Sequence, residues 1–276
     1  MKIGTIARFS TVAEAEDKFR ELSEYGFEQC QISYRGDISD LSAAKEIRAV
    51  ADRYNIEISA MFVSYGDADT VWDNYYGFLT AGINVESYRV RRVDKVRSSL
   101  PFVKALGITD AVIHAGFIPN NPFCPSYALM KTSVRFIAMD CQKLGLNLLF
   151  ETGGESPVAF LRLFTDLGFD NLYINLDPAN MLMYGYANPV DAIYTIGKYV
   201  RNIHGKDGLP PTDPVKLGAE TPIGEGKVDF YAMFRELKKV GYDRYVTIER
   251  EISGPQQKQD ILKAKAYFEK LLSEVY

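Results

Sequence analysis

The sequence predicts a single-domain α/β protein that folds as a closed (β/α)8 barrel, and three observations support this prediction. Short apolar runs rich in β-branched residues alternate with segments whose apolar residues recur at helical spacing. This alternation occurs eight times, and sustained alternation indicates parallel strands joined by crossover helices. The length of 276 residues suits such a barrel, which commonly needs about 250 residues as one domain. We therefore expect one domain over residues 1–276, with its functional face at the carboxyl ends of the strands.

Eight segments are expected to form the strands, because each is a short strand-like run bounded by polar or turn residues. In chain order they are Lys2–Phe9, Glu28–Ser33, Ile56–Val63, Asp110–His114, Asn147–Glu151, Asn171–Asp177, Val200–Gly208 and Tyr245–Glu249. Eight strands at this length favour a closed barrel over an open sheet.

The segments between the strands carry apolar stripes of helical period. Thr11 and Glu14 form a capping-box pattern before the first helix, and Gly26 lies where that helix is expected to end. The apolar residues that mark the helices are, in chain order, Ala15, Phe19 and Leu22; Ala44, Ile47 and Ala51; Val93, Val96 and Leu100; Tyr127, Met130 and Val134; Phe160, Leu163 and Phe164; Val190, Ile193 and Ile196; those within Phe230–Val240; and Ile261, Ala264 and Phe268. Each stripe is expected to pack against the barrel.

The segment from Tyr65 to Ser87 breaks this alternation. It has no clear period and is rich in aromatic residues, among them Trp72, Tyr75 and Phe78. An aromatic insertion after a strand is compatible with a lid or a contact between subunits of a homo-oligomer. A short extra helix packed on the barrel rim explains the composition equally well.

The composition argues against several classes of protein. The net charge of −4 argues against a protein that grips nucleic acid through its phosphates. No apolar run approaches the length of about 18 residues needed to span a bilayer, and the chain opens with a strand-like run, so no signal peptide is expected. The three cysteines are far apart and form no CxxC pair, which favours a reducing compartment. We expect a cytoplasmic protein.

The later strands end in side chains that can bind a metal. The runs at the core of strands five to eight lead into Glu151, Asp177, His204 and Glu249, and strand four ends in His114. Clustered ionised carboxylates at a barrel rim are costly without a compensating cation. Three carboxylates and one imidazole supply a ligand set for one divalent ion, namely Mn²⁺, Mg²⁺, Co²⁺ or Zn²⁺.

Each of these residues, taken alone, has an ordinary structural explanation. A single Glu or Asp after a strand is usually a helix cap or part of a rim salt bridge, and a lone histidine such as His114 is usually a core residue. Their occurrence at four successive strand ends is what favours a metal site.

Several motifs occur in a fixed order along the chain. They are Leu149-Phe150-Glu151, Leu176-Asp177-x-x-Asn180-Met181, Ile203-His204-x-Lys206-Asp207-Gly208, Ile223-Gly224-Glu225-Gly226-x-Val228-Asp229-Phe230 and Ile248-Glu249-x-Glu251. As an ordered set they resemble the xylose isomerase-like barrels, the sugar-phosphate isomerase and epimerase superfamily, which includes ketose 3-epimerases and inosose-processing enzymes. The resemblance covers the whole chain and implies that Glu151, Asp177, His204 and Glu249 are metal ligands.

The chain also departs from its relatives. Many relatives carry histidine where this chain has Asn180. The superfamily also includes AP endonucleases, whose three-zinc site needs several more histidines than the two present here. DNA-repair cleavage is therefore not expected.

Five further residues are candidate substrate contacts. His114 ends a predicted strand and is therefore expected on the functional face of the barrel, and the resemblance to barrels with a histidine there supports a substrate contact. Asn180 is equally compatible with a turn cap, Lys206 with a salt bridge to Asp207, Glu225 with a turn residue, and Glu251 with a rim residue without a role. The five are His114, Asn180, Lys206, Glu225 and Glu251.

These residues suggest a metal-dependent isomerase or epimerase of a sugar, a sugar phosphate or a polyol, and the sequence leaves open whether the substrate is phosphorylated. Glu151 and Glu249 reach the substrate from different sides, so one removes a proton next to a carbonyl and the other returns it. The alternatives are a dehydratase or hydrolase on the same metal site, and a barrel that binds a polyol without turnover. No glycine-rich phosphate loop of the mononucleotide or dinucleotide type is present, and no nicotinamide cofactor is expected.

Overall fold

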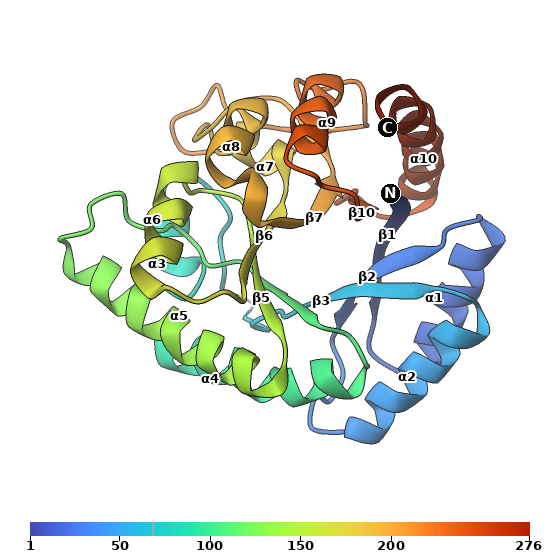
Figure 1. The fold of residues 1–276 in the computed structure, drawn as a ribbon, viewed down its shortest axis with the longest axis horizontal. Helices are drawn as coiled ribbons and strands as arrows, with labels where there is room; N and C mark the ends of the chain where they lie inside the picture. Colours follow the sequence, from blue (N-terminus) through green and yellow to red (C-terminus); the bar gives the residue numbers. More distant parts are fainter. Residues whose placement is uncertain (68) are drawn as a thin grey trace.

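Eight parallel strands close into a barrel in the order β1–β10–β7–β6–β5–β4–β3–β2. The structure is a computed structural model and describes residues 1–67 and 69–276. The barrel strands are β1 (Lys2–Phe9), β2 (Gln29–Tyr34), β3 (Glu57–Phe62), β4 (Asp110–Ile113), β5 (Asn147–Glu151), β6 (Leu172–Leu176), β7 (Val200–Gly205) and β10 (Tyr245–Ile248). The predicted (β/α)8 barrel is confirmed (Figure 1).

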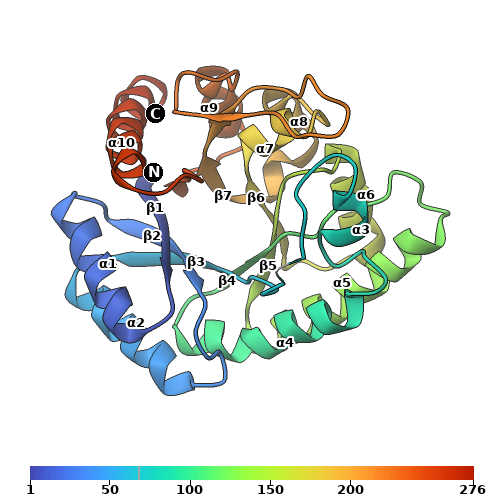
Figure 2. The ribbon, with the colours of Figure 1, turned by 180° about the vertical axis from the view of Figure 1, so that it is seen from behind.

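Helices surround the strands, as both views show (Figures 1 and 2). They are α1 (Val12–Glu24), α2 (Leu41–Arg53), α3 (Gly77–Thr80), α4 (Arg89–Ala105), α5 (Pro125–Leu144), α6 (Pro157–Leu167), α7 (Pro178–Met183), α8 (Pro189–Ile196), the 3₁₀ turn η1 (Gly197–Tyr199), α9 (Phe230–Lys239) and α10 (Pro255–Val275). No helix of the described chain is both long and apolar enough to cross a membrane. The two termini lie close together beside β1 and α10.

Two apolar layers hold the barrel together. Most strand and helix residues join one large core between the barrel and its helices, as the alternating side chains of parallel strands require. A second, small cluster of Ala60, Val112 and Leu149 forms inside the barrel, with Phe62 and Tyr173 against it. Side chains therefore fill the middle of the barrel, and a cavity opens near the carboxyl ends of the strands.

The end of predicted strand seven differs from expectation. The prediction of one strand over Val200–Gly208 is wrong at its end, because β7 stops at Gly205. Residues Asp207–Gly208 instead form β8, which pairs antiparallel with β9 (Glu220–Thr221) in a separate two-stranded sheet. The chain leaves the barrel at Lys206 and enters a loop that folds back over the rim.

Helix α7 was not expected from the sequence. It follows β6 directly, and its residues are almost all buried. A short segment buried on several sides has no amphipathic period, so periodicity does not reveal it.

The aromatic insertion between β3 and α4 contains the short helix α3 and also reaches over the barrel mouth. Asn74 N–H donates to the carbonyl oxygen of Val215 at 2.8 Å, which joins the insertion to the loop after β8. Buried Arg92 on α4 fixes the insertion's base, because its Nε lies 2.5 Å from Asp67 Oδ2. Residue Ala68 of this segment lies outside the described residues.

Candidate functional site

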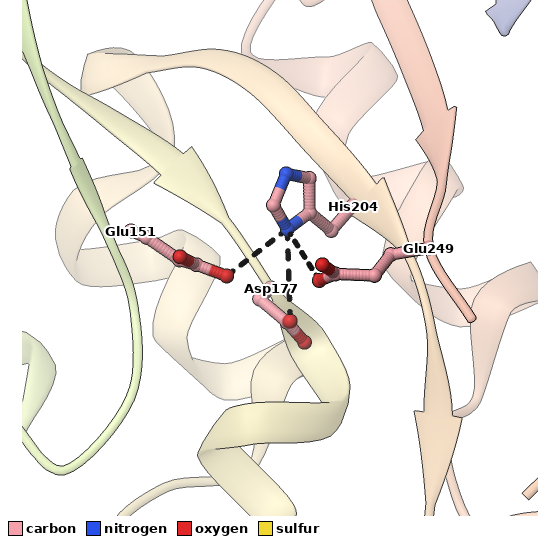
Figure 3. A group of neighbouring side chains, drawn as sticks. All are labelled: Glu151, Asp177, His204 and Glu249. Carbon is pink, nitrogen blue, oxygen red and sulfur yellow. Dashed lines mark hydrogen bonds and ion pairs between the residues drawn. The ribbon is translucent and has the colours of Figure 1, made fainter. Parts of the chain in front are cut away.

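Four buried side chains from four neighbouring strands meet at one point (Figure 3). Glu151 is the last residue of β5, Asp177 follows β6, His204 lies in β7 and Glu249 follows β10. One ligand atom from each lies within 4.8 Å of all the others. The sequence predicted that these four residues converge, and the geometry agrees with that prediction.

Asp177 illustrates how local structure aims a side chain into the site. It is the N-cap of α7, and its Oδ1 accepts a hydrogen bond from the N–H of Asn180 at 2.8 Å. Its other oxygen, Oδ2, lies 3.7 Å from His204 Nδ1. The sequence left a helix cap and a metal ligand as alternative roles for this acid, and the position is compatible with both at once.

The imidazole of His204 is oriented by groups on both sides. Its Nδ1 lies 3.1 Å from Glu151 Oε1 and 3.1 Å from Glu249 Oε2. Its Nε2 lies 2.7 Å from Gln31 Oε1 and 3.0 Å from Asn175 Nδ2. An N–H on Nε2 that donates to Gln31 leaves the Nδ1 lone pair facing the three carboxylates, as a metal-binding histidine requires.

The charges of the group are mutually dependent. Burial opposes protonation of His204, but the carboxylates of Glu249 and Glu151 outweigh it and raise the pKa of the imidazole well above its ordinary value. Burial raises the pKa of Glu151 to about 7. For Glu249 burial acts in the same direction, but the cations Lys206 and His204 outweigh it and lower the pKa. The protein thus needs positive charge at this point, and without a metal a proton on His204 supplies part of it.

The residues present fit a divalent cation. Asp177 Oδ2 and Glu249 Oε2 are buried and accept no hydrogen bond from the described residues, although both lie 3.1–3.7 Å from nitrogens of His204 and Lys206. A buried carboxylate oxygen without a donor is costly unless a cation faces it. Three carboxylates and one imidazole, with ligand atoms this close together, form a donor set for Mn²⁺, Mg²⁺, Co²⁺ or Zn²⁺.

Lys206 is a buried cation beside this group, with only 2% of its surface exposed. Its Nζ lies 3.1 Å from Glu251 Oε2 and 3.5 Å from Asp177 Oδ2, and donates to Asn180 Oδ1 at 3.2 Å. Burial opposes the charge, but Glu249, Asp177 and Glu251 outweigh it and raise the pKa of the ammonium well above its usual value. Lys206 therefore stays charged and is held by three acidic or amide groups. The salt bridge to Asp207 that the sequence offered as an alternative is absent from the described ion pairs.

A cavity of about 330 Å³ opens beside the four-residue group, and Glu151 and Glu249 line it. It is large enough for a sugar-sized molecule. Its walls are formed by Ile6, Arg8, Ser33, Arg35, Phe62, Ser64, Trp72, His114, Glu151, Asn180, Met183, Tyr184, Lys206, Leu217, Glu249 and Glu251. Of the five predicted substrate contacts, His114, Asn180, Lys206 and Glu251 line this cavity.

His114 lies on the cavity wall beneath the insertion. The ring centroids of His114 and Trp72 are 4.5 Å apart, and burial lowers the pKa of His114 to about 4. The imidazole is therefore neutral near pH 7, and its buried Nδ1 has no hydrogen-bond partner among the described residues. The ring fits because residue 153 is glycine: a Cβ there would lie 2.7 Å from the imidazole.

Glu225 lies apart from these residues. It is exposed and does not line the cavity. Its neighbours serve the loop instead, because Asp207 accepts hydrogen bonds from the N–H groups of Gly224 and Gly226 at 2.9 and 3.0 Å. Asp207 thus fastens the loop over the barrel rim.

Four residues of the site were missed by the sequence analysis. Arg8 on β1 lies 3.0 Å from Glu249 Oε1, Gln31 and Asn175 contact His204, and Trp72 lies over His114. Asn175 interrupts a run that is otherwise apolar, which was the one signal available, whereas Gln31 lies in a strand segment that contains other polar residues. Arg8 and Trp72 become site residues only through the closure of the barrel and the path of the insertion.

Comparison with known proteins agrees with the fold. An uncharacterized protein of Methanocaldococcus jannaschii is 23% identical over 278 residues, covering 95% of this chain and 88% of the relative. A solved xylose isomerase domain protein from Planctomyces limnophilus superposes with a TM-score of 0.88 at 25% identity, covering 99% of this chain and 97% of that one. A solved protein described as D-tagatose 3-epimerase-like gives a TM-score of 0.75 at 20% identity, covering 100% and 98%.

The family assignment follows from a match along most of the sequence. The family model described as "Xylose isomerase-like TIM barrel" matches residues 19–271. That span includes the strands that carry all four members of the buried group. The chain therefore belongs to the xylose isomerase-like TIM barrel family.

Proposed function

We propose that the protein is a metal-dependent isomerase or epimerase of a sugar or related polyol. The observation that carries the proposal is the convergence of Glu151, Asp177, His204 and Glu249 beneath a sugar-sized cavity. These four residues would hold one divalent cation. When bound, the cation would polarise a substrate carbonyl and so acidify the adjacent C–H bond.

Glu151 and Glu249 are the proposed proton-transfer residues. They stand on strands β5 and β10, which are separated in the barrel by β6 and β7, so their carboxylates reach the cavity from different sides. One carboxylate takes the proton from the carbon beside the carbonyl. The other delivers a proton to the opposite face, which inverts that carbon. A proton moved between neighbouring carbons on one face gives isomerisation instead.

The remaining polar residues of the wall are proposed to position the substrate. Lys206 presents a positive charge beside the acids, Asn180 a side-chain amide, and neutral His114 an imidazole that can bind a hydroxyl. Glu251 is exposed enough to reach a hydroxyl at the mouth. The likeness to a D-tagatose 3-epimerase-like structure supports the reaction class, since that neighbour shares the fold.

The test is solvent exchange during turnover of a ketose and polyol panel. In D2O, with Mn²⁺ supplied, proton transfer through Glu151 or Glu249 should place deuterium at the substrate carbon. The Glu249→Gln variant should lose at least about 100-fold in kcat, the lower end of what a positioned acid or base contributes. Glu269→Gln, which removes the same charge from the exposed face of α10, is the matched control.

Three outcomes would overturn the proposal. Turnover without deuterium incorporation, together with full activity of Glu249→Gln, would remove the proton-transfer mechanism. Formation of an ultraviolet-absorbing dicarbonyl would indicate elimination, hence a dehydratase. Thermal stabilisation by a polyol without any product would indicate a binding protein.

A further inference from the structure

The cavity wall formed by β1 and β2 carries two arginines. Arg8 on β1 is paired in register with Ser33 on β2. Arg35 follows two residues later, and alternate residues of an extended segment point to the same side. Arg8, Ser33 and Arg35 all line the cavity, whereas the four metal-competent residues come from the strands β5, β6, β7 and β10.

The two arginines differ from Lys206 in how they are paired. The ammonium of Lys206 is already surrounded by Glu251, Asp177 and Asn180. Arg8 contacts Glu249 through Nη2 alone, and its side chain is 37% exposed. Arg35 is exposed, and among the described residues its guanidinium forms no ion pair or side-chain hydrogen bond. Arg35 is therefore a cation on the cavity wall whose charge is not compensated within the described structure.

An adjoining cavity extends the same wall. Arg35 and Ser64 line both the substrate cavity and a second space of about 360 Å³, which Lys95 also lines. The acid in this second space, Asp67, is already paired with Arg91 and Arg92. Beyond Arg35 there is thus further room and further positive charge.

We propose that the substrate carries an anionic group, a phosphate or a carboxylate, on the side away from its reacting carbonyl, and that Arg35 binds that group, assisted by the N–H groups of Arg8 that Glu249 does not engage. The inference rests on the proposed function, because it assumes that the carbonyl end lies at the four-residue group. Guanidinium groups bind carboxylate and phosphate through paired, charge-assisted hydrogen bonds. A neutral sugar would leave the guanidinium of Arg35 on the cavity wall without an anion, whereas Arg8 already contacts Glu249.

Binding is tested first with inorganic phosphate by isothermal titration, with and without Mn²⁺. Phosphate held by the arginines should bind in both conditions, and the affinity for phosphate should fall at least about tenfold in the Arg35→Gln variant. The matched control is Arg235→Gln, because Arg235 is exposed on α9 and does not line the cavity. Equal phosphate affinity of wild type and Arg35→Gln, or no binding at about 10 mM phosphate, overturns the inference.

Turnover is tested with matched pairs that differ only in the anionic group. The pairs are a ketose with its terminal phosphate and a ketose with its terminal carboxylate, each against the neutral ketose. Arg35→Gln should lower the ratio of kcat/KM for the charged over the neutral substrate by at least about tenfold, mainly through KM. The pair in which this ratio falls identifies the anion as phosphate or carboxylate.

Failure of this inference and failure of the proposed function give different results. If neutral ketoses are epimerised and Arg35→Gln leaves the ratio unchanged, the reaction stands and the anion site is wrong. If no ketose is turned over but phosphate binding still depends on Arg35, the anion site stands and the reaction is wrong.

Discussion

Single residues in this site serve the fold and the proposed chemistry together. Asp177 caps α7 with one oxygen and faces His204 with the other. Gln31 accepts from one nitrogen of His204 and donates to Asn175 Oδ1 at 3.2 Å. The orientation of the imidazole is thus fixed by buried amides that never reach the proposed metal position.

Gln31 should act as a positioning residue. Replacing it in Gln31→Met removes the acceptor for His204 Nε2, so the imidazole loses its fixed orientation. We expect the affinity for Mn²⁺ to fall about 10- to 100-fold, as for other partners of metal-binding histidines. Titration calorimetry measures this, with Gln29→Met as the control, because Gln29 is buried on the same strand but bonds Val246 and Thr247 instead. Equal affinities for all three proteins would show that Gln31 does not position His204.

Glu155 should make stability depend on pH. It is 1% exposed, and burial raises the pKa of its carboxyl well above the usual value. The folded state therefore favours the protonated acid, so its contribution is fully present below the unfolded-state pKa and is lost as pH rises through the folded-state pKa.

The Glu155→Gln variant removes this titration. Its free energy of unfolding, relative to wild type, should increase from pH 4 to pH 8 by about 1.4 kcal/mol for each pKa unit by which burial raises the acid. Urea unfolding at several pH values measures the difference, and Glu269→Gln should show no such trend. A difference between Glu155→Gln and wild type that is constant with pH would contradict the assignment of a buried, protonated acid.

At the scale of elements, two loops roof the cavity and each has its own anchor. The insertion after β3 is tied to α4 by Arg92 and Asp67 and supplies Trp72. The loop between β8 and α9 supplies Leu217 and is held by Asp207. Gly226 allows this, since a Cβ there would lie 2.1 Å from Asp207 Oδ1.

Removing the anchor in Asp207→Ala should loosen the loop without touching the four-residue group. Four backbone N–H groups lose their acceptor, those of Gly208, Gly224, Gly226 and Val228. We expect faster hydrogen exchange at these amides and a higher KM, while the bound metal is retained. Asp170→Ala, on an exposed turn, is the control. Unchanged exchange at these amides would mean that other contacts hold the loop.

The sequence predicted the elements better than the details at their ends. Gly26 was expected where the first helix ends, and it follows the C-cap of α1 with a positive φ. The strand ends at Glu151 and Glu249 were predicted correctly because an acidic residue directly follows an apolar run at each of them. The break at Lys206 was not found, because β8 depends on pairing with Glu220–Thr221, which is distant in sequence.

The same limit applies to the candidate site. The four metal-competent residues follow a pattern that repeats from strand to strand, so the sequence alone suggests them. Arg8 and Arg35 have no such pattern, and only the register of β1 with β2 brings them to one wall. Glu225 lies between two glycines in a motif that the sequence singled out. The backbone N–H groups of those glycines donate to Asp207, and the carboxylate of Glu225 does not line the cavity.

At the scale of the whole molecule, closing the barrel unites strands from both halves of the chain around one centre of charge. A cation bound there should therefore stabilise the entire fold. At a concentration about 100 times its Kd, a ligand that binds only the folded state adds about 2.7 kcal/mol. For a chain of this size each kcal/mol raises Tm by about 2–4 °C.

Mn²⁺ should accordingly raise Tm by about 5–10 °C, and a chelator should reverse the rise. Differential scanning calorimetry measures both, with Glu269→Gln behaving as wild type. Asp177→Asn keeps an oxygen to cap α7 but loses the charge, and its Tm should not respond to Mn²⁺. A rise of equal size in Asp177→Asn would place the stabilising ion elsewhere.

The most direct measurement of the central claim is the metal content of the protein after equilibration with Mn²⁺ and removal of unbound ion. The wild-type chain should retain one ion. Glu151→Gln, Asp177→Asn and Glu249→Gln should each retain almost none, while Glu269→Gln retains one. A wild-type chain without bound ion, or the three variants with a full complement, would contradict the claim that these side chains form a metal centre.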